Sequence, residues 1–309
     1  MLTYHVQLHS SGIKDILWAW RCLKIKKPCP LLFSYALWPT EKFKSVLEFI
    51  ADFGVPVRYI LDSGAFTGYK EHKLLSIEKY ADWLREFGKG ADFYFTLDVI
   101  GSDKKTKENF EKLCQLGFSP IPVWHVLWSS VEILEQWVQK PISLLAIGGL
   151  VIKGGKERII RKTLNSVWGL LSEHRVHGLG MGTTRWLRKY PWYSIDSSFL
   201  AKEMSGAGLV MLLSGGKIKR VSVGYKFPEG LRKIFCYKPS FCMLEHEFGL
   251  NGIFEEFLNL ATREYKNGKP TAEFRRFRLL VSLATLEQIN RYREQYVSDN
   301  KEIHHSSRA

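Results

Sequence analysis

The stretch VRYILDSGAF, residues 57–66, carries the pattern that decides the fold. Its run of β-branched, aromatic and aliphatic residues, 57–61, predicts a buried strand, and the Asp-Ser-Gly that follows is typical of a turn. Amphipathic segments near 41–53 and 76–87 predict a helix on either side. A strand between two helices is one repeat of a parallel α/β fold.

The same alternation extends over the first two thirds of the chain, and no repeat of solenoid length is present. Eight strands in βα order favour a (β/α)8 TIM barrel in the α/β class. The alternative is an open doubly wound sheet, but no G-x-G-x-x-G follows the first strand. We expect strands near Thr3–Leu8, Leu31–Leu37, Val57–Leu61, Phe93–Asp98, Ile121–Val126, Leu144–Ile147, Val176–Gly180 and Trp192–Asp196. We expect helices near Gly12–Leu23, Glu41–Phe53, Ser76–Phe87, Lys105–Leu116, Ser130–Gln139, Lys156–Leu171 and Thr184–Lys189.

The pattern changes after the eighth strand. A hairpin is predicted across Ser214–Gly216, and two long helices are predicted near Gly252–Lys266 and Ala272–Val297. We therefore divide the chain into a barrel core, a hairpin with C-terminal helices packed on the barrel as an extension, and a flexible tail. The expected limits are 1–205, 206–300 and 301–309.

The composition indicates a polyanionic partner. Lys and Arg number 45 against 31 Asp and Glu, which gives a formal net charge of +14. Basic side chains release counterions when they neutralise phosphates, so nucleic acid is the expected partner, with a merely basic surface as the alternative. The odd, scattered set of five Cys is not typical of a disulfide framework. With no leader and no long apolar run in the sequence, we expect a cytoplasmic protein, in the host cytoplasm if it is viral, and no membrane partner.

Polar residues end several of the predicted strands, where the reactive groups of a barrel lie. Each has an ordinary structural explanation. Asp62 suits a turn, Asp98 and Asp196 suit helix caps, and His125 suits a buried core position. Their convergence on one rim favours an active site.

These strand ends also resemble those of a known family. Leu61-Asp62-Ser63-Gly64-Ala65-Phe66 is similar to the "DSGGF" signature of tRNA-guanine transglycosylases, with Ala65 replacing a Gly. Ala146-Ile147-Gly148-Gly149-Leu150 resembles their base-recognition loop, and 177–183 resembles their "MGVGT" strand. The resemblance covers roughly residues 55–200 and is closer to the phage-type deoxypurine-in-DNA transglycosylases, through Pro122-Val123-Trp124-His125 and 188–197.

The resemblance implies an exchange of guanine in DNA for a 7-deazaguanine, of which 7-cyano-7-deazaguanine is the expected one. Asp196 falls at the position of the nucleophile, and Asp62 is the expected general acid and base. The expected base-binding residues are Ser63, Gly64, Phe66, Asp98, His125, Gly148, Gly149, Leu150, His177 and Met181. The expected contacts to nucleic-acid phosphates are Lys153, Lys156, Arg158, Arg185, Arg188 and Lys189, for which a solvated helix face is the alternative.

The sequence departs from the tRNA enzymes in their zinc region. Only Cys236, Cys242 and His246 stand there, and a structural zinc site needs four ligands, so we expect no cofactor unless these three hold zinc with a fourth ligand. Expected partners are DNA, or tRNA, and a 7-deazaguanine base, with a homodimer as one option for the assembly. Three other functions stay open: a tRNA-guanine transglycosylase, a glycoside hydrolase barrel with paired carboxylates, and a nucleic-acid-binding barrel without catalysis.

Overall fold

The computed structural model describes residues 2–6, 10–150, 156–180, 189–197, 209–215, 217–223, 226 and 228–306. The chain divides into two compact units. The larger comprises Leu2–Leu8 and Pro28–Phe199, and the smaller comprises Met1, His9–Lys27 and Leu200–Ala309. The sequence places the first predicted helix with the barrel, whereas the structure groups it with the C-terminal unit.

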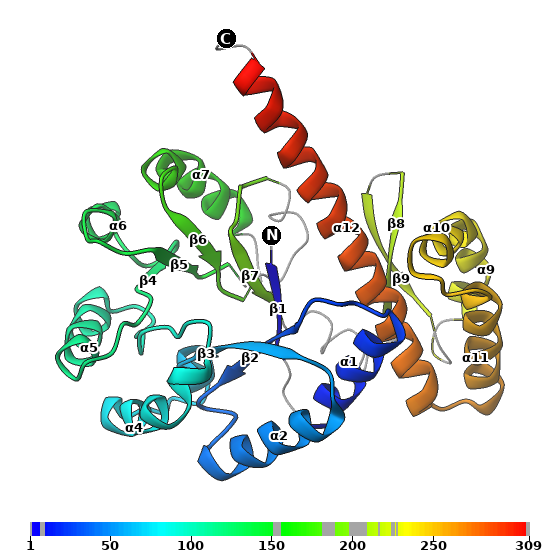
Figure 1. Cartoon of the computed structure of the whole chain (residues 1–309), viewed down its shortest axis with the longest axis horizontal. Coiled ribbons are helices and arrows are strands. Elements are labelled where there is room, and N and C mark those ends of the chain that lie inside the picture. Colours follow the sequence, from blue (N-terminus) through cyan, green and yellow to red (C-terminus); the bar gives the residue numbers. More distant parts are fainter. Residues whose placement is uncertain are drawn as a thin grey trace. The chain divides into compact units, whose positions relative to one another are not determined.

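The larger unit is an α/β fold built on a curled, parallel sheet of seven strands in the order β3-β2-β1-β7-β6-β5-β4. Its helices surround the strands (Figure 1). The strands are β1 (Leu2–Val6), β2 (Cys29–Ser34), β3 (Val57–Asp62), β4 (Val123–His125), β5 (Leu144–Gly148), β6 (Arg175–Gly178) and β7 (Ser194–Ser197). The helices are α2 (Thr40–Phe53), α3 (Ala65–Lys70), α4 (Ile77–Phe87), α5 (Asp103–Gln115), α6 (Val131–Val138) and α7 (Glu157–Val167), with short turns η1 (Gly88–Gly90) and η2 (Trp168–Leu171).

Of the eight predicted strands, the fourth does not form a continuous strand in the structure. Segment 93–96 forms single bridges rather than a continuous ladder, on one side with β3 and on the other with the residues before β4. The Phe95 N–H donates to the Leu61 carbonyl at 3.0 Å, and the Thr96 N–H donates to the Ile121 carbonyl at 2.9 Å. The other seven predicted strands are confirmed as parallel strands, and the fourth is an extended segment paired on both sides.

The inner face of the sheet follows from the two-residue period of strands. An apolar cluster fills it, comprising Tyr4, Leu32, Ile60, Phe95, Val123 and Ala146. On β2, β3, β4 and β5 the next inward position lies two residues further on, and there the residue type changes. Ser34, Asp62, His125 and Gly148 follow in this way. Asp196 pairs with Tyr4 across β1 and β7, so it faces the same side. The polar strand ends therefore form a second layer on top of the apolar one.

The smaller unit contains the predicted hairpin and C-terminal helices. Its β8 (Leu209–Ser214) and β9 (Lys217–Ser222) pair antiparallel. The Ser282 hydroxyl accepts the Met211 N–H at 3.0 Å, which attaches the last helix to the hairpin. Arg276 pairs with the buried Asp15 at 2.6 Å, which attaches the same helix to the first one. The helices are α1 (Ser10–Cys22), α9 (Pro228–Ile234), α10 (Lys238–Phe248), α11 (Ile253–Asn267) and α12 (Ala272–Ser306), with the short turn η3 (Phe235–Tyr237).

The last helix, α12, extends to Ser306 and so enters the segment for which the sequence predicts a flexible tail. Within the described part of the chain, no helix combines the length and apolar character that a membrane span requires.

Candidate active site

A hydrogen-bonded cluster centres on Asp98, which follows the bridged segment 93–96. Its side chain is 8% exposed. The Ser63 hydroxyl donates to Asp98 Oδ1 at 2.9 Å, and Nε2 of His125 lies 2.9 Å from Oδ2. A carboxylate can only accept, so the histidine donates. The helix-cap alternative for Asp98 is wrong, because Ser102 caps α5 by accepting the Lys105 N–H.

A second cluster holds Asp196 at the end of β7. This carboxylate is 5% exposed. Its Oδ1 accepts from His177 Nε2 at 3.1 Å and from the Gly180 N–H at 2.8 Å. The other ring nitrogen of His177 lies 2.8 Å from the Ser194 hydroxyl, so the imidazole is fixed at both ends. Both of these hydrogen bonds end on Oδ1.

Asp62 connects the two clusters electrostatically. Burial, together with the negative charges of Asp98 and Asp196, raises the pKa of this carboxyl to about 7. The backbone N–H of Gly64 acts in the opposite direction through a 2.9 Å hydrogen bond to Oδ2. The charges of Asp98 and Asp196 therefore both act on the pKa of Asp62.

The turn after β3 requires glycine. Gly64 has a φ of 80°, and a Cβ built on it would lie 2.4 Å from the Cβ of Ala36. Its N–H closes the turn onto Asp62, so the turn-aspartate explanation is confirmed. The tight turn starts α3 directly at the rim of the sheet.

The residues after β5 shape the space beside His125. A Cβ on Gly148 would lie 2.7 Å from Cδ2 of that ring, so only glycine admits the imidazole here. Gly149 has a φ of 79° and packs on Trp128. The side chain of Leu150 is buried. Gly148 and Gly149 therefore leave backbone, with no side chain of their own, beside His125 and Trp128.

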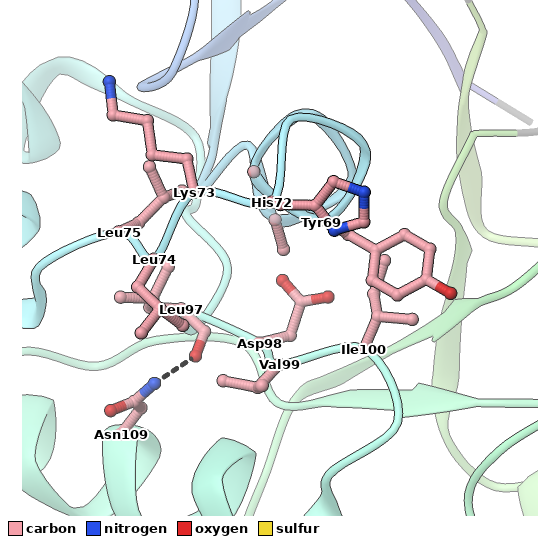
Figure 2. Close-up of a pocket in the computed structure, with 12 residues that line it drawn as sticks. Tyr69, His72, Lys73, Leu74, Leu75, Leu97, Asp98, Val99, Ile100 and Asn109 are labelled. Atoms are coloured by element: carbon pink, nitrogen blue, oxygen red, sulfur yellow. Dashed lines mark hydrogen bonds between the residues drawn. The ribbon is translucent and has the colours of Figure 1, made fainter.

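A cavity of about 300 Å³ adjoins Asp98 (Figure 2). It lies between the end of α3 and the residues that follow segment 93–96, and it is lined by Tyr69, His72, Leu74, Val99 and Ile100 among others. Phe66, one of the predicted base-binding residues, is 44% exposed, and the Lys70 ammonium lies 4.3 Å from its ring centre.

The predicted phosphate contacts are described only in part. Lys156 and Arg158 are exposed at the start of α7, and Lys189 is exposed with its ammonium 5.5 Å from the Tyr190 ring. Lys153, Arg185 and Arg188 lie outside the described residues, as does Met181.

The zinc option finds no support in the described residues. No group of three or more His, Cys, Asp or Glu side chains there is placed to hold a metal ion. Cys236 and Cys242 are exposed free thiols, and His246 lies on α10.

Three groups that the sequence analysis did not select belong to the site: the Ser34 side chain, the Ser194 hydroxyl and the Gly180 N–H. Ser34 lies across from Asp62 in the β2–β3 ladder, and Ser194 faces His177 from the neighbouring strand. The two-residue period of the inner face could have identified Ser34 and Ser194. A backbone donor leaves no signal of its own in a sequence.

No protein-family model matches the chain, and no curated protein is significantly similar to it in sequence. Among solved structures, a mutant tryptophan synthase alpha-subunit from the hyperthermophile Pyrococcus furiosus aligns with a TM-score of 0.41 and 12% identity, over 67% of this chain and 91% of that one. A protein from Coccidioides immitis, provisionally assigned as a fructose-1,6-biphosphate aldolase, aligns with a TM-score of 0.49 and 11% identity, over 92% and 91% of the two chains. Neither similarity identifies an activity, a substrate or a family for this chain.

Proposed function

We propose that this chain is a guanine transglycosylase, a pentosyltransferase that exchanges guanine in DNA for a 7-deazaguanine, on a closed (β/α)8 barrel in which segment 93–96 is the eighth strand. The observation that carries the proposal is the set of three inward carboxyl groups, one of which has a pKa near 7. A double displacement at a sugar needs one carboxylate as nucleophile and a second carboxyl that both gives and takes a proton.

In the first displacement, Oδ2 of Asp196 attacks C1′ of the target nucleotide. The C1′–N9 bond breaks, its electron pair passes to guanine, and Asp62 gives the leaving base a proton. A carboxylate suits this role because it also stabilises the positive charge that develops on the sugar. The donors on Oδ1, from His177 and Gly180, fix the orientation of the attacking oxygen.

In the second displacement, N9 of the incoming 7-deazaguanine attacks C1′ and the bond to Asp196 breaks. The proton that N9 loses goes to Asp62, which regains its starting state. Asp62 must therefore act as an acid and then as a base, and a pKa of about 7 makes both forms available near neutral pH.

Base recognition is assigned to Asp98 and the loop after β5. The amino and ring N–H groups of a guanine-like base are donors, and Asp98 is an acceptor held rigidly by Ser63 and His125. Backbone groups at Gly148 and Gly149 suit the edge of the ring, and Phe66 suits its face. A purine reaches such a pocket only after leaving its stack, so a duplex substrate requires base flipping.

Mass spectrometry of nucleosides tests the proposal. DNA and tRNA are incubated separately with the protein and 7-cyano-7-deazaguanine, and the nucleosides are then analysed. We expect 7-deazaguanine deoxynucleoside from DNA. Product in tRNA alone would assign the chain to the RNA-modifying alternative. Guanine released without an incoming base, with an abasic site left in the polymer, would identify a hydrolase.

Loss of exchange in both polymers, with salt-dependent binding retained, would leave a nucleic-acid-binding barrel without catalysis. The Asp196→Asn variant is the control for each arm, because it preserves shape and removes the nucleophile. A covalent protein–nucleic acid adduct on denaturing gels is expected from the wild type and not from this variant.

A further inference from the structure

The cavity beside Asp98 is a compartment distinct from the catalytic cluster. Of the described site residues Asp62, Asp98, His125 and Asp196, only Asp98 lines it. Its volume, about 300 Å³, is at the lower end of the range for ligand pockets and is enough for one planar ring system. The cavity touches the proposed base-recognition residue, Asp98, but not Asp62 or Asp196. It is therefore placed for a nucleotide next to the one that reacts.

The outer wall of this cavity is exposed and aromatic. Tyr69 is 57% exposed and Leu74 is 86% exposed, although both border a recess in which apolar side chains are ordinarily covered. Figure 2 shows the rings of Tyr69 and His72 on the same side of the Asp98 carboxylate, with the Lys73 side chain extending away from the cavity. The wall therefore offers a ring for stacking and cationic or polar groups at the rim.

The backbone holds this wall in a defined and unusual conformation. The Lys73 N–H donates to the Gly68 carbonyl at 2.9 Å, and the His72 N–H donates to the Tyr69 carbonyl at 3.4 Å. These two bonds form the Schellman motif that ends α3, whose left-handed position is usually glycine. Here that position is His72, with a φ of 52°. His72 thus carries its imidazole, at a position that favours glycine, on the edge of the cavity that it lines.

We propose that this cavity binds the nucleotide adjacent to the one that is exchanged, in an unpaired state, with its base stacked on Tyr69 and its phosphate near His72. The inference deepens the proposed function and rests on it for the identity of the neighbouring nucleotide. Aromatic rings with nearby cations are how proteins hold unpaired nucleotides, since every base has a face that can stack. Asp98 is the sole acidic residue that lines the described cavity, and Glu71 in the same turn does not line it.

Fluorescence of 2-aminopurine tests this directly. Single-stranded and duplex oligonucleotides with one guanine carry 2-aminopurine at each adjoining position in turn, and the full chain is titrated against them. In the wild type we expect stacking to quench the fluorescence at one adjoining position. Tyr69→Ala should lose the quench and bind about tenfold more weakly, the effect of one lost base–aromatic stack. Tyr265→Ala, at an exposed tyrosine on α11 that does not line this cavity, should change neither quantity.

His72→Gly separates a binding role from a structural one. Glycine relieves the left-handed backbone, so thermal stability should stay the same or rise, while affinity should fall about threefold as a phosphate contact is lost. Unchanged affinity in this variant would overturn the role of His72. A wild type that quenches no adjoining position, or a Tyr69→Ala variant that quenches normally, would overturn the proposed subsite. Exchange activity without quenching would contradict this inference alone, and quenching without exchange would contradict the proposed function alone.

Discussion

Two layers of the same sheet face, one pleat apart, differ in residue type on β2, β3 and β4. The lower layer consists of apolar side chains such as Ile60, Phe95 and Val123, all nearly inaccessible to solvent. The upper layer, starting two residues later on the same strands, carries Asp62 and His125. Both layers are positioned by one set of backbone hydrogen bonds, so the comparison isolates the effect of side-chain chemistry.

The comparison separates the side chains whose burial stabilises the fold from the side chains whose burial opposes folding. Apolar burial stabilises the fold by about 25 cal/mol for each Å² removed from water, so the lower layer contributes favourably. Buried carboxyl groups oppose folding unless they are hydrogen-bonded, and like charges oppose it further. Asp62, whose pKa is raised to about 7 by burial and by two neighbouring carboxylates, lies in a destabilised environment that suits proton transfer.

The largest effect is expected from Asp196→Asn in the upper layer. Base exchange should fall at least about 1,000-fold, since an amide cannot form the sugar ester. The folding free energy should hardly decrease, because the variant removes a negative charge from a crowded site. Incorporation of labelled guanine and thermal melting measure the two effects. Full exchange by the variant would assign the nucleophile to another residue.

The opposite result is expected from Phe95→Ala in the lower layer. This ring is fully buried and contacts Phe93 and His177, with centroids 5.5 Å and 5.0 Å away. Its removal should reduce the free energy of unfolding by about 3–5 kcal/mol. The molecules that remain folded should keep most of their exchange activity. Phe95→Leu, which leaves a smaller void, is the matched control and should cost less than about 1.5 kcal/mol.

The sequence predicted the layers better than their edges. The run 57–61 followed by Asp-Ser-Gly was sufficient to place β3 and the reactive turn, because strand periodicity and turn chemistry are both local. The sequence predicted a strand near 93–98, and the structure has an extended segment there that forms only single bridges. The sequence could not predict this difference, because pairing depends on the register of two neighbours that are distant along the chain. The structure brings Asp98 and His125 into one hydrogen-bonded cluster and His177 and Asp196 into a second. The turn that ends α3 was not predicted, because His72 occupies a left-handed position where glycine is the usual signal.

A smaller and pH-dependent effect is expected from Asp62→Asn. The folded pKa of about 7 exceeds the ordinary value of 3.8, so the folded state binds this proton more tightly than the unfolded state does. The contribution of the Asp62 carboxyl to the free energy of unfolding is therefore highest at low pH, and it is lost as the pH rises through 7. Between pH 5 and pH 8 the wild type should lose about 2–3 kcal/mol more than the variant. Urea titrations at pH 5 and pH 8 measure the free energy of unfolding of both proteins. Equal losses in the two proteins would contradict the raised pKa of Asp62.

The smallest effect tests the one side chain that belongs to both layers. The ring of His177 packs on Phe95 of the lower layer, while its Nε2 holds Asp196 of the upper layer at 3.1 Å. His177→Phe keeps the packing and removes the donor, so stability should change little. The maximal rate of exchange should fall about 10- to 100-fold with KM nearly unchanged, because the oriented carboxylate matters most in the transition state. Ser194→Ala removes only the far hydrogen bond of the ring, at 2.8 Å, and should cost a few-fold. A rate in His177→Phe equal to the wild type would mean that the Gly180 N–H alone positions the nucleophile, and that the histidine belongs to the lower layer only.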